Sequence, residues 1–125
     1  MTPRHTPSPA PGAEPDDAQA GAGLRDDPDG CDLGAELLKA IAHPLRLRIV
    51  AILCEGEQQV GALAARLGAP QAIVSQQLRL LRMRELVKAN RSNGHARYHL
   101  AEVRLRRVIL CLEGCVRERR GGGRS

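Results

Sequence analysis

Two short amphipathic helices, joined by a glycine-containing turn and followed at once by a hairpin signal, limit the fold of this chain most strongly. Apolar residues recur at helical spacing on both sides of the turn Gly68-Ala69-Pro70. The residues predicted to face inward are Val60, Leu63, Ala64 and Leu67 before the turn, and Val74, Gln77, Leu78 and Leu81 after it. Helix, turn and helix in this order are typical of a helix-turn-helix unit.

The hydrophobic period changes after Glu85. Residues 86–90 and 97–100 form two short strand-like runs, and Asn93-Gly94 between them favours a tight hairpin. A hairpin that directly follows a helix-turn-helix is a wing. We therefore predict a mainly α (α+β) fold, a winged helix-turn-helix with about five helices and a β-hairpin wing.

Two further helices are predicted before this unit and one after it. The first ends near His43-Pro44, because the residue before a proline is disfavoured in helical geometry, and Pro44 suits the opening turn of the second. The apolar positions are Leu33, Leu37, Leu38 and Ile41 in the first helix, Leu45, Ile49, Ile52 and Leu53 in the second, and Leu105, Val108, Ile109, Leu112 and Val116 in the last. The last helix has more apolar surface than a small monomer covers, which indicates dimerisation.

Composition divides the chain into three parts. Residues 1–32 hold six of the eight prolines and a net charge of −5, and we expect them to be a disordered acidic arm. Residues 33–118 are expected to form the folded domain, about 85 residues long, and 119–125 a flexible basic tail. The residues after the arm carry +10, which points to a polyanionic partner.

The residue types present also exclude several classes of function. Tyr98 is the only aromatic residue, so recognition of single strands by stacking is disfavoured and duplex DNA is the better prediction. No apolar run approaches the roughly 20 residues of a membrane span, and no secretory leader is visible, so a cytoplasmic protein is expected. No nucleophile–base pair, phosphate loop or strong metal motif appears, and an enzyme is not predicted.

Two segments resemble the ArsR/SmtB family of winged-helix repressors. Residues 38–50, LKAIAHPLRLRIV, are similar to that family's helix junction, and residues 74–81, VSQQLRLL, to its recognition helix. The resemblance covers about residues 33–118. It implies a homodimer, paired through its first and last helices, that binds an imperfect palindrome of double-stranded DNA and leaves it when an inducer binds.

The predicted recognition helix presents polar side chains opposite its apolar stripe. Gln can pair with adenine and Ser with several base edges, so Ser75 and Gln76 are the predicted base-reading residues, while Arg79 and Arg82 are assigned to phosphates. The full set of predicted DNA-binding residues is Gln71, Ser75, Gln76, Arg79, Arg82, Arg91 and Arg97. For Asn93 and His95 a DNA contact and an ordinary polar hairpin tip both remain open. Pro70 cannot supply the side-chain acceptor of a usual helix cap.

The inducer site is predicted at cysteines. Residues 58–63 lack the Cys-Val-Cys pair, and the last helix lacks the Asp/His and His/Glu pairs, that metal-sensing members of the family carry. Cys111 and Cys115 have the i, i+4 spacing that places two thiols on one helix face, where a soft metal, a metalloid or an oxidising sulfur species could bind. Cys54 ends the second helix and would approach that face if the helices pack as in the family.

No cofactor is required in this interpretation. A metal, if any, would be a soft ion at Cys54, Cys111 and Cys115, and the alternative inducer chemistry is persulfide modification of the same thiols. The alternative function is a constitutive DNA-binding regulator with structural cysteines and no inducer. Cys31 lies in the predicted arm, and no role is assigned to it.

Overall fold

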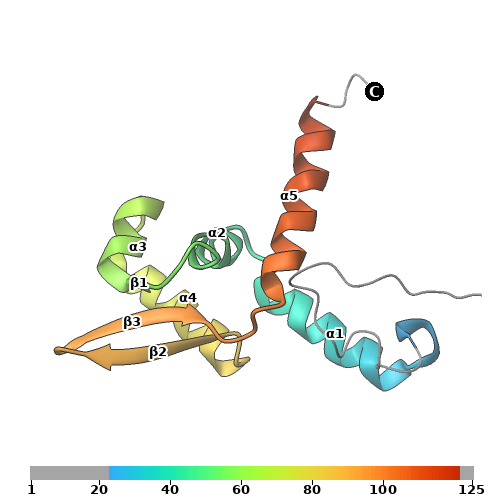
Figure 1. The fold of residues 1–125 in the computed structure, drawn as a ribbon, viewed down its shortest axis with the longest axis horizontal. Coiled ribbons are helices and arrows are strands. Elements are labelled where there is room, and N and C mark those ends of the chain that lie inside the picture. Colours follow the sequence, from blue (N-terminus) through green and yellow to red (C-terminus); the bar gives the residue numbers. More distant parts are fainter. Residues whose placement is uncertain (1–22, 122–125) are drawn as a thin grey trace, which may run out of the picture. The chain divides into compact units, whose positions relative to one another are not determined.

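A computed structural model of the chain describes residues 23–121. These fall into two units, which meet between Ala35 and Glu36 within helix α1 and are described separately. Five α-helices and three strands are present in the described part (Figure 1). The predicted winged helix-turn-helix is confirmed.

In the first unit, residues that we predicted to be disordered are helical. A 3₁₀ turn covers Leu24–Asp26, and α1 (Pro28–Ile41) begins four residues before the predicted domain boundary. The Gly30 N–H donates to Asp27 Oδ1 (2.9 Å), so the side chain of Asp27 caps the helix and Pro28 occupies its first turn. Residues 28–32 are therefore helical rather than disordered. Residues 1–22 of the predicted arm lie outside the described part.

In the second unit, α2 (Pro44–Leu53), α3 (Val60–Leu67) and α4 (Gln71–Met83) follow in the predicted order. His43 Nδ1 accepts the Leu45 N–H (3.2 Å) and caps α2. Gly68 ends α3 with φ of +65°, a left-handed conformation that glycine adopts at little cost. As predicted, Pro70 precedes α4 without a side-chain cap. Its carbonyl oxygen accepts the Ile73 and Val74 N–H groups instead.

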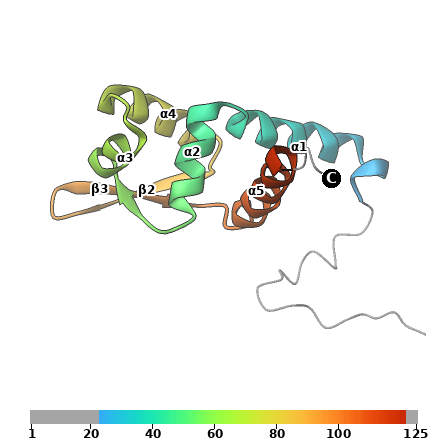
Figure 2. The ribbon, with the colours of Figure 1, turned by 90° about the horizontal axis from the view of Figure 1, so that it is seen from above.

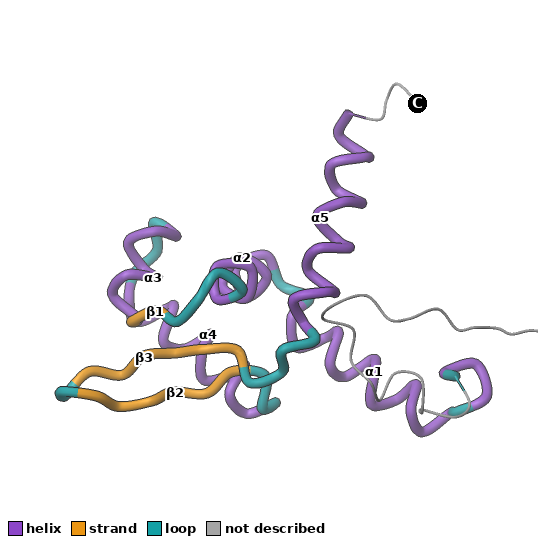
Figure 3. The backbone as a smooth tube through the Cα atoms, viewed as in Figure 1, coloured by secondary structure: helices purple, strands orange, loops and turns teal. Residues whose placement is uncertain are grey.

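The wing consists of β2 (Val87–Ser92) and β3 (His95–Leu100), paired antiparallel with Ser92 opposite His95. Asn93 and Gly94 form the turn with φ of +53° and +80°, as an Asn-Gly hairpin requires. A third strand, β1 (Gln58–Gln59), pairs with the other edge of β3 and was not predicted. The hairpin extends away from the helices, and its turn is its free end (Figures 1 and 3).

The hydrophobic core is built from α2, α3, α4 and the base of the wing, and Ile41 of α1 and two residues of α5 (Leu105–Gly121) join it. Figure 2 shows α2 lying between the helix-turn-helix and α5. Only Leu105 and Ile109 of α5 are buried, and its other apolar side chains are exposed. The helix ends at Gly121, so residues 119–121 of the predicted tail are helical, while 122–125 lie outside the described part. No helix within residues 23–121 is both long and apolar enough to cross a membrane.

Replacing Leu78, which is 1% exposed, by alanine should lower the free energy of unfolding by about 2–5 kcal/mol, because a cavity replaces buried methyl groups. Met83 lies in the same helix and is 71% exposed, so Met83→Ala should change this free energy by about 0.5 kcal/mol or less. Urea denaturation at one protein concentration measures both. Equal losses in the two variants would contradict the assigned core.

Candidate nucleic-acid interface and thiol sites

The buried side of α4 determines which of its side chains face solvent. Val74, Leu78 and Leu81 are almost fully buried in the core. A half-buried Arg46 adds a polar constraint, because its guanidinium donates to Gln77 Oε1 (2.9 Å) and to the Ala40 carbonyl (2.6 Å). The helix is therefore held at a fixed rotation about its own axis.

This rotation exposes most of the polar side chains predicted to bind DNA. Gln71, Gln76, Arg79 and Arg82 are exposed, and Ser75 is half-buried. These positions recur at three- and four-residue intervals, so they form one ridge along the helix. Helix α4 also packs against β2, which brings the base of the wing to the end of this ridge.

The two arginines of the wing that were predicted to bind DNA, Arg91 and Arg97, lie in different environments. Arg91 is exposed near the hairpin tip, where Asn93 and His95 are exposed as well. Arg97, in contrast, is half-buried, and its Nε donates to Glu57 Oε1 (3.1 Å). The pairing of β1 with β3 places Gln59 opposite Arg97 and thereby brings Glu57 close to it. The guanidinium of Arg97 would have to share or leave this carboxylate to hold a phosphate.

One candidate was missed by the sequence analysis. Lys88 of β2 is exposed and lines the same depression of about 350 Å³ as Arg82 and His99. The sequence pattern could have identified Lys88, because side chains alternate between the two faces of a strand and Lys88 follows the apolar Val87. Lys88 and Arg82 together place two cations where α4 meets the wing.

The four cysteines are free thiols. Cys111 and Cys115 are exposed on one face of α5 and line an apolar pocket of about 370 Å³ together with Leu38 and Ile41. Cys31 belongs to the first unit, and its Sγ donates to the Leu24 carbonyl (3.1 Å). Among residues 23–121, no three Cys, His, Asp or Glu side chains are arranged to hold a metal ion.

Cys54 has a different environment at the end of α2. Burial raises the pKa of its thiol, Arg106 opposes this effect, and Glu113 and Glu55 add to it. The guanidinium of Arg106 also donates to the Cys54 carbonyl. Arg106 and Glu113 are seven residues apart and share one side of α5, whereas Cys111 and Cys115 project from about the opposite side. Within one chain, Cys54 therefore meets a different side of α5 from the one that carries Cys111 and Cys115.

Comparisons with known proteins agree with this geometry. The family model described as bacterial regulatory protein, arsR family, matches residues 43–89, from the cap of α2 into β2. The biofilm growth-associated repressor of Xylella fastidiosa is 38% identical over 78 residues, which cover 62% of this chain and 68% of that protein.

Two solved structures extend the similarity to the fold. The transcriptional repressor BigR from Xylella fastidiosa superposes with a TM-score of 0.69 at 33% identity, over 75% of this chain and 96% of that one. A homodimeric winged helix-turn-helix domain from Mycobacterium bovis, described as a possible ArsR-family regulator, gives 0.66 at 29% identity over 80% and 92%. The relatives are transcriptional regulators rather than enzymes. The chain belongs to the arsR family of bacterial regulatory proteins.

Proposed function

We propose that this protein is a transcriptional repressor that binds a double-stranded DNA operator through α4 and the wing. The observation that carries the proposal is the ridge of exposed polar side chains on α4, whose opposite side is fixed in the core. The repressor names of its relatives support it. A helix about 10–12 Å wide fits the major groove of B-DNA, which is about 12 Å wide.

The predicted DNA-binding side chains fall into two groups, one that contacts base edges and one that contacts phosphates. Gln76 and Ser75 lie in the N-terminal half of α4 and read base edges, since Gln can form two hydrogen bonds with adenine. Arg79, Arg82 and Lys88 hold phosphates and set the register on the duplex. Gln71 adds a polar contact at the start of the helix, and Arg91 carries positive charge along the wing.

The active species in this proposal is a homodimer. Helices α1 and α5 carry several exposed large apolar side chains, among them Leu38 (59% exposed), Val108 (40%) and Leu110 (66%). A second copy that covers them removes apolar surface from water, at about 25 cal/mol per Å². The homodimeric domain from Mycobacterium bovis supports this assembly. Two recognition helices would then read the two halves of a palindrome.

Release from DNA is proposed to follow from chemistry at cysteine thiols. Cys111 and Cys115 are accessible and share one face of α5, so they can bind a soft metal or metalloid ion together or react with an oxidising sulfur species. Cys54 contacts α5 through Arg106, and a change at its thiol acts on the same helix. A coupling of about 1–3 kcal/mol between these sites and DNA is enough to regulate.

Gln76→Ala should reduce the preference for the operator over unrelated duplex by about 1–3 kcal/mol, because it removes contacts to base edges. Arg79→Ala should weaken binding to both duplexes and make log K less dependent on log[salt] by about one unit of slope. Fluorescence anisotropy across salt concentrations, with an operator selected from random DNA, measures both effects. Arg119→Ala removes one cation from α5 and is the control; wild-type behaviour of both α4 variants would refute this reading face.

Cys54→Ser and Cys111→Ser should each retain operator binding and lose release, since neither residue lies on α4 or the wing. Release is measured by gel shift after treatment with arsenite, cadmium or polysulfide, with mass spectrometry to locate the modified thiol. Cys31→Ser is the control and should be released like the wild type. If both test variants are also released normally, the thiol switch is wrong and the constitutive regulator is favoured.

The alkylation of Cys54 should depend on pH in a way set by its burial. Desolvation disfavours the thiolate, so the midpoint of its reaction with iodoacetamide should lie at higher pH in the native protein than in urea. Arg106 lowers this pKa, so Arg106→Gln should raise the native midpoint further. Mass spectrometry of the Cys54 peptide measures the rates. Coincident native and urea profiles would show that the thiol is not desolvated.

A further inference from the structure

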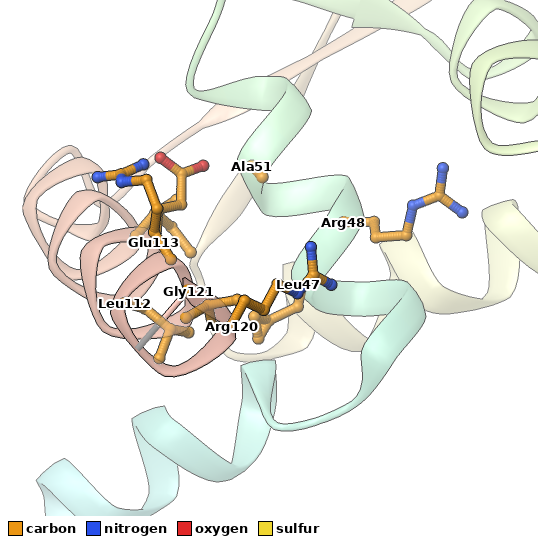
Figure 4. A pocket seen from close by; sticks show the side chains of 10 residues that line it. Leu47, Arg48, Ala51, Leu112, Glu113, Arg120 and Gly121 are labelled. Atoms are coloured by element: carbon orange, nitrogen blue, oxygen red, sulfur yellow. The ribbon is translucent and has the colours of Figure 1, made fainter. Parts of the chain in front are cut away.

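A groove with an apolar floor runs between α2 and α5 (Figure 4), and neither Cys111 nor Cys115 lines it. The groove is open to solvent on one side and has a volume of about 740 Å³, within the range of roughly 300–1,000 Å³ that is common for small-molecule sites. Its floor is formed by aliphatic side chains from both helices: Leu47, Ala51, Ile109, Leu112 and Val116.

The space exists because of two features of these helices. Ala51 lies on the α2 wall one turn beyond Leu47, where a longer aliphatic side chain would extend toward the groove (Figure 4). Helix α5 has 17 residues against 10 in α2, so its C-terminal turns continue beyond the buried contact at Ile109. As a result Leu112 and Val116 remain 38% and 41% exposed along the groove.

The rim of the groove is positively charged. Arg117 and Arg120 line it against one acidic residue, Glu113. Arg48 also lines it, but its guanidinium donates to the Leu67 carbonyl (3.4 Å) and extends away from α5 (Figure 4). Figure 4 shows Arg120 extending from α5 toward Leu47 on the opposite wall. Neither Arg117 nor Arg120 forms an ion pair or side-chain hydrogen bond with another residue in the described ranges. The C-terminus of α5 contributes only about −0.5 charge, so the arginines dominate the local potential.

We propose that this groove binds an amphiphilic anion, a compound with an apolar alkyl or aryl body and one carboxylate group. The apolar body covers Ala51, Leu112 and Val116, and the carboxylate pairs with Arg120 and Arg117, whose planar guanidinium groups suit bidentate recognition. No cysteine lines this groove, although Leu47 and Leu112 also line the pocket that contains Cys111 and Cys115. Binding in the groove does not require that the protein be released from DNA by oxidation or metal.

The test uses the full-length chain and two probes of equal length and opposite charge, decanoate and decyltrimethylammonium, each below its micelle concentration. Isothermal titration calorimetry should show one decanoate per chain and at least about tenfold weaker binding of the cation, a difference of about 1.4 kcal/mol. Equal affinities would overturn the charge argument. Absence of decanoate binding to a protein that sedimentation shows to be dimeric would overturn the site in favour of coverage by a second copy.

Three variants locate the site. The double variant Arg117→Gln, Arg120→Gln should weaken decanoate binding at least about tenfold, whereas Arg119→Gln, which removes a charge outside the groove lining, should not. Ala51→Leu should weaken both probes by filling the floor, with circular dichroism to verify folding. Unchanged affinity in the arginine double variant would overturn the proposal. Operator binding, measured separately, shows whether the DNA-binding proposal stands or fails on its own.

Discussion

The rotation of α4 about its axis is the constraint on which the rest of the structure depends. Val74, Leu78 and Leu81 are 0–1% exposed, so turning the helix would bring large apolar side chains into water, at about 1.5–3 kcal/mol for each. Arg46 also restricts the rotation of α4, because its guanidinium donates both to Gln77 and to the Ala40 carbonyl near the end of α1. Hydrophobic contacts alone would tolerate small rotations of α4, whereas the hydrogen bond from Arg46 to Gln77 requires a defined orientation of the helix. The polar ridge faces outward for these two reasons.

Elements governed by local pattern could be predicted from the sequence, and those governed by tertiary pairing could not. Helices α2 to α5 and the Asn-Gly turn follow from apolar spacing, proline and glycine, which act within a few residues. Strand β1 has two glutamines and no strand-like pattern, and it exists because β3 offers a free edge. The early start of α1 has a local signal in Asp27-Pro28, an N-cap followed by a favoured first residue. The proline-rich, acidic composition of residues 1–32 predicts disorder instead, and the prediction followed the composition.

The same division applies to the candidate site residues. The exposure of Gln76 and Arg79 follows from helical periodicity, so the sequence was sufficient. The pairing of Arg97 with Glu57 spans 40 residues and depends on β1, which leaves no local signal. The separation of Cys54 from Cys111 and Cys115 has a similar cause. The i, i+4 spacing places Cys111 and Cys115 on one face of α5. Which face of α5 lies next to Cys54 depends on how α2 packs on α5, and the sequence has no local signal for this packing.

The apolar side chains of α5 are spread over more than one side of the helix, so its contact with the core covers only some of them. Its buried residues, Leu105 and Ile109, join it to the core, while Val108 and Cys111 face one pocket and Val116 the groove on the other side. Leu112, together with Leu47 of α2, lines both hollows. A change in how Leu112 packs on one side must therefore alter the surface it offers on the other. Any partner or ligand that binds one face of α5 is thus placed to influence the second through Leu47 and Leu112, which line both hollows.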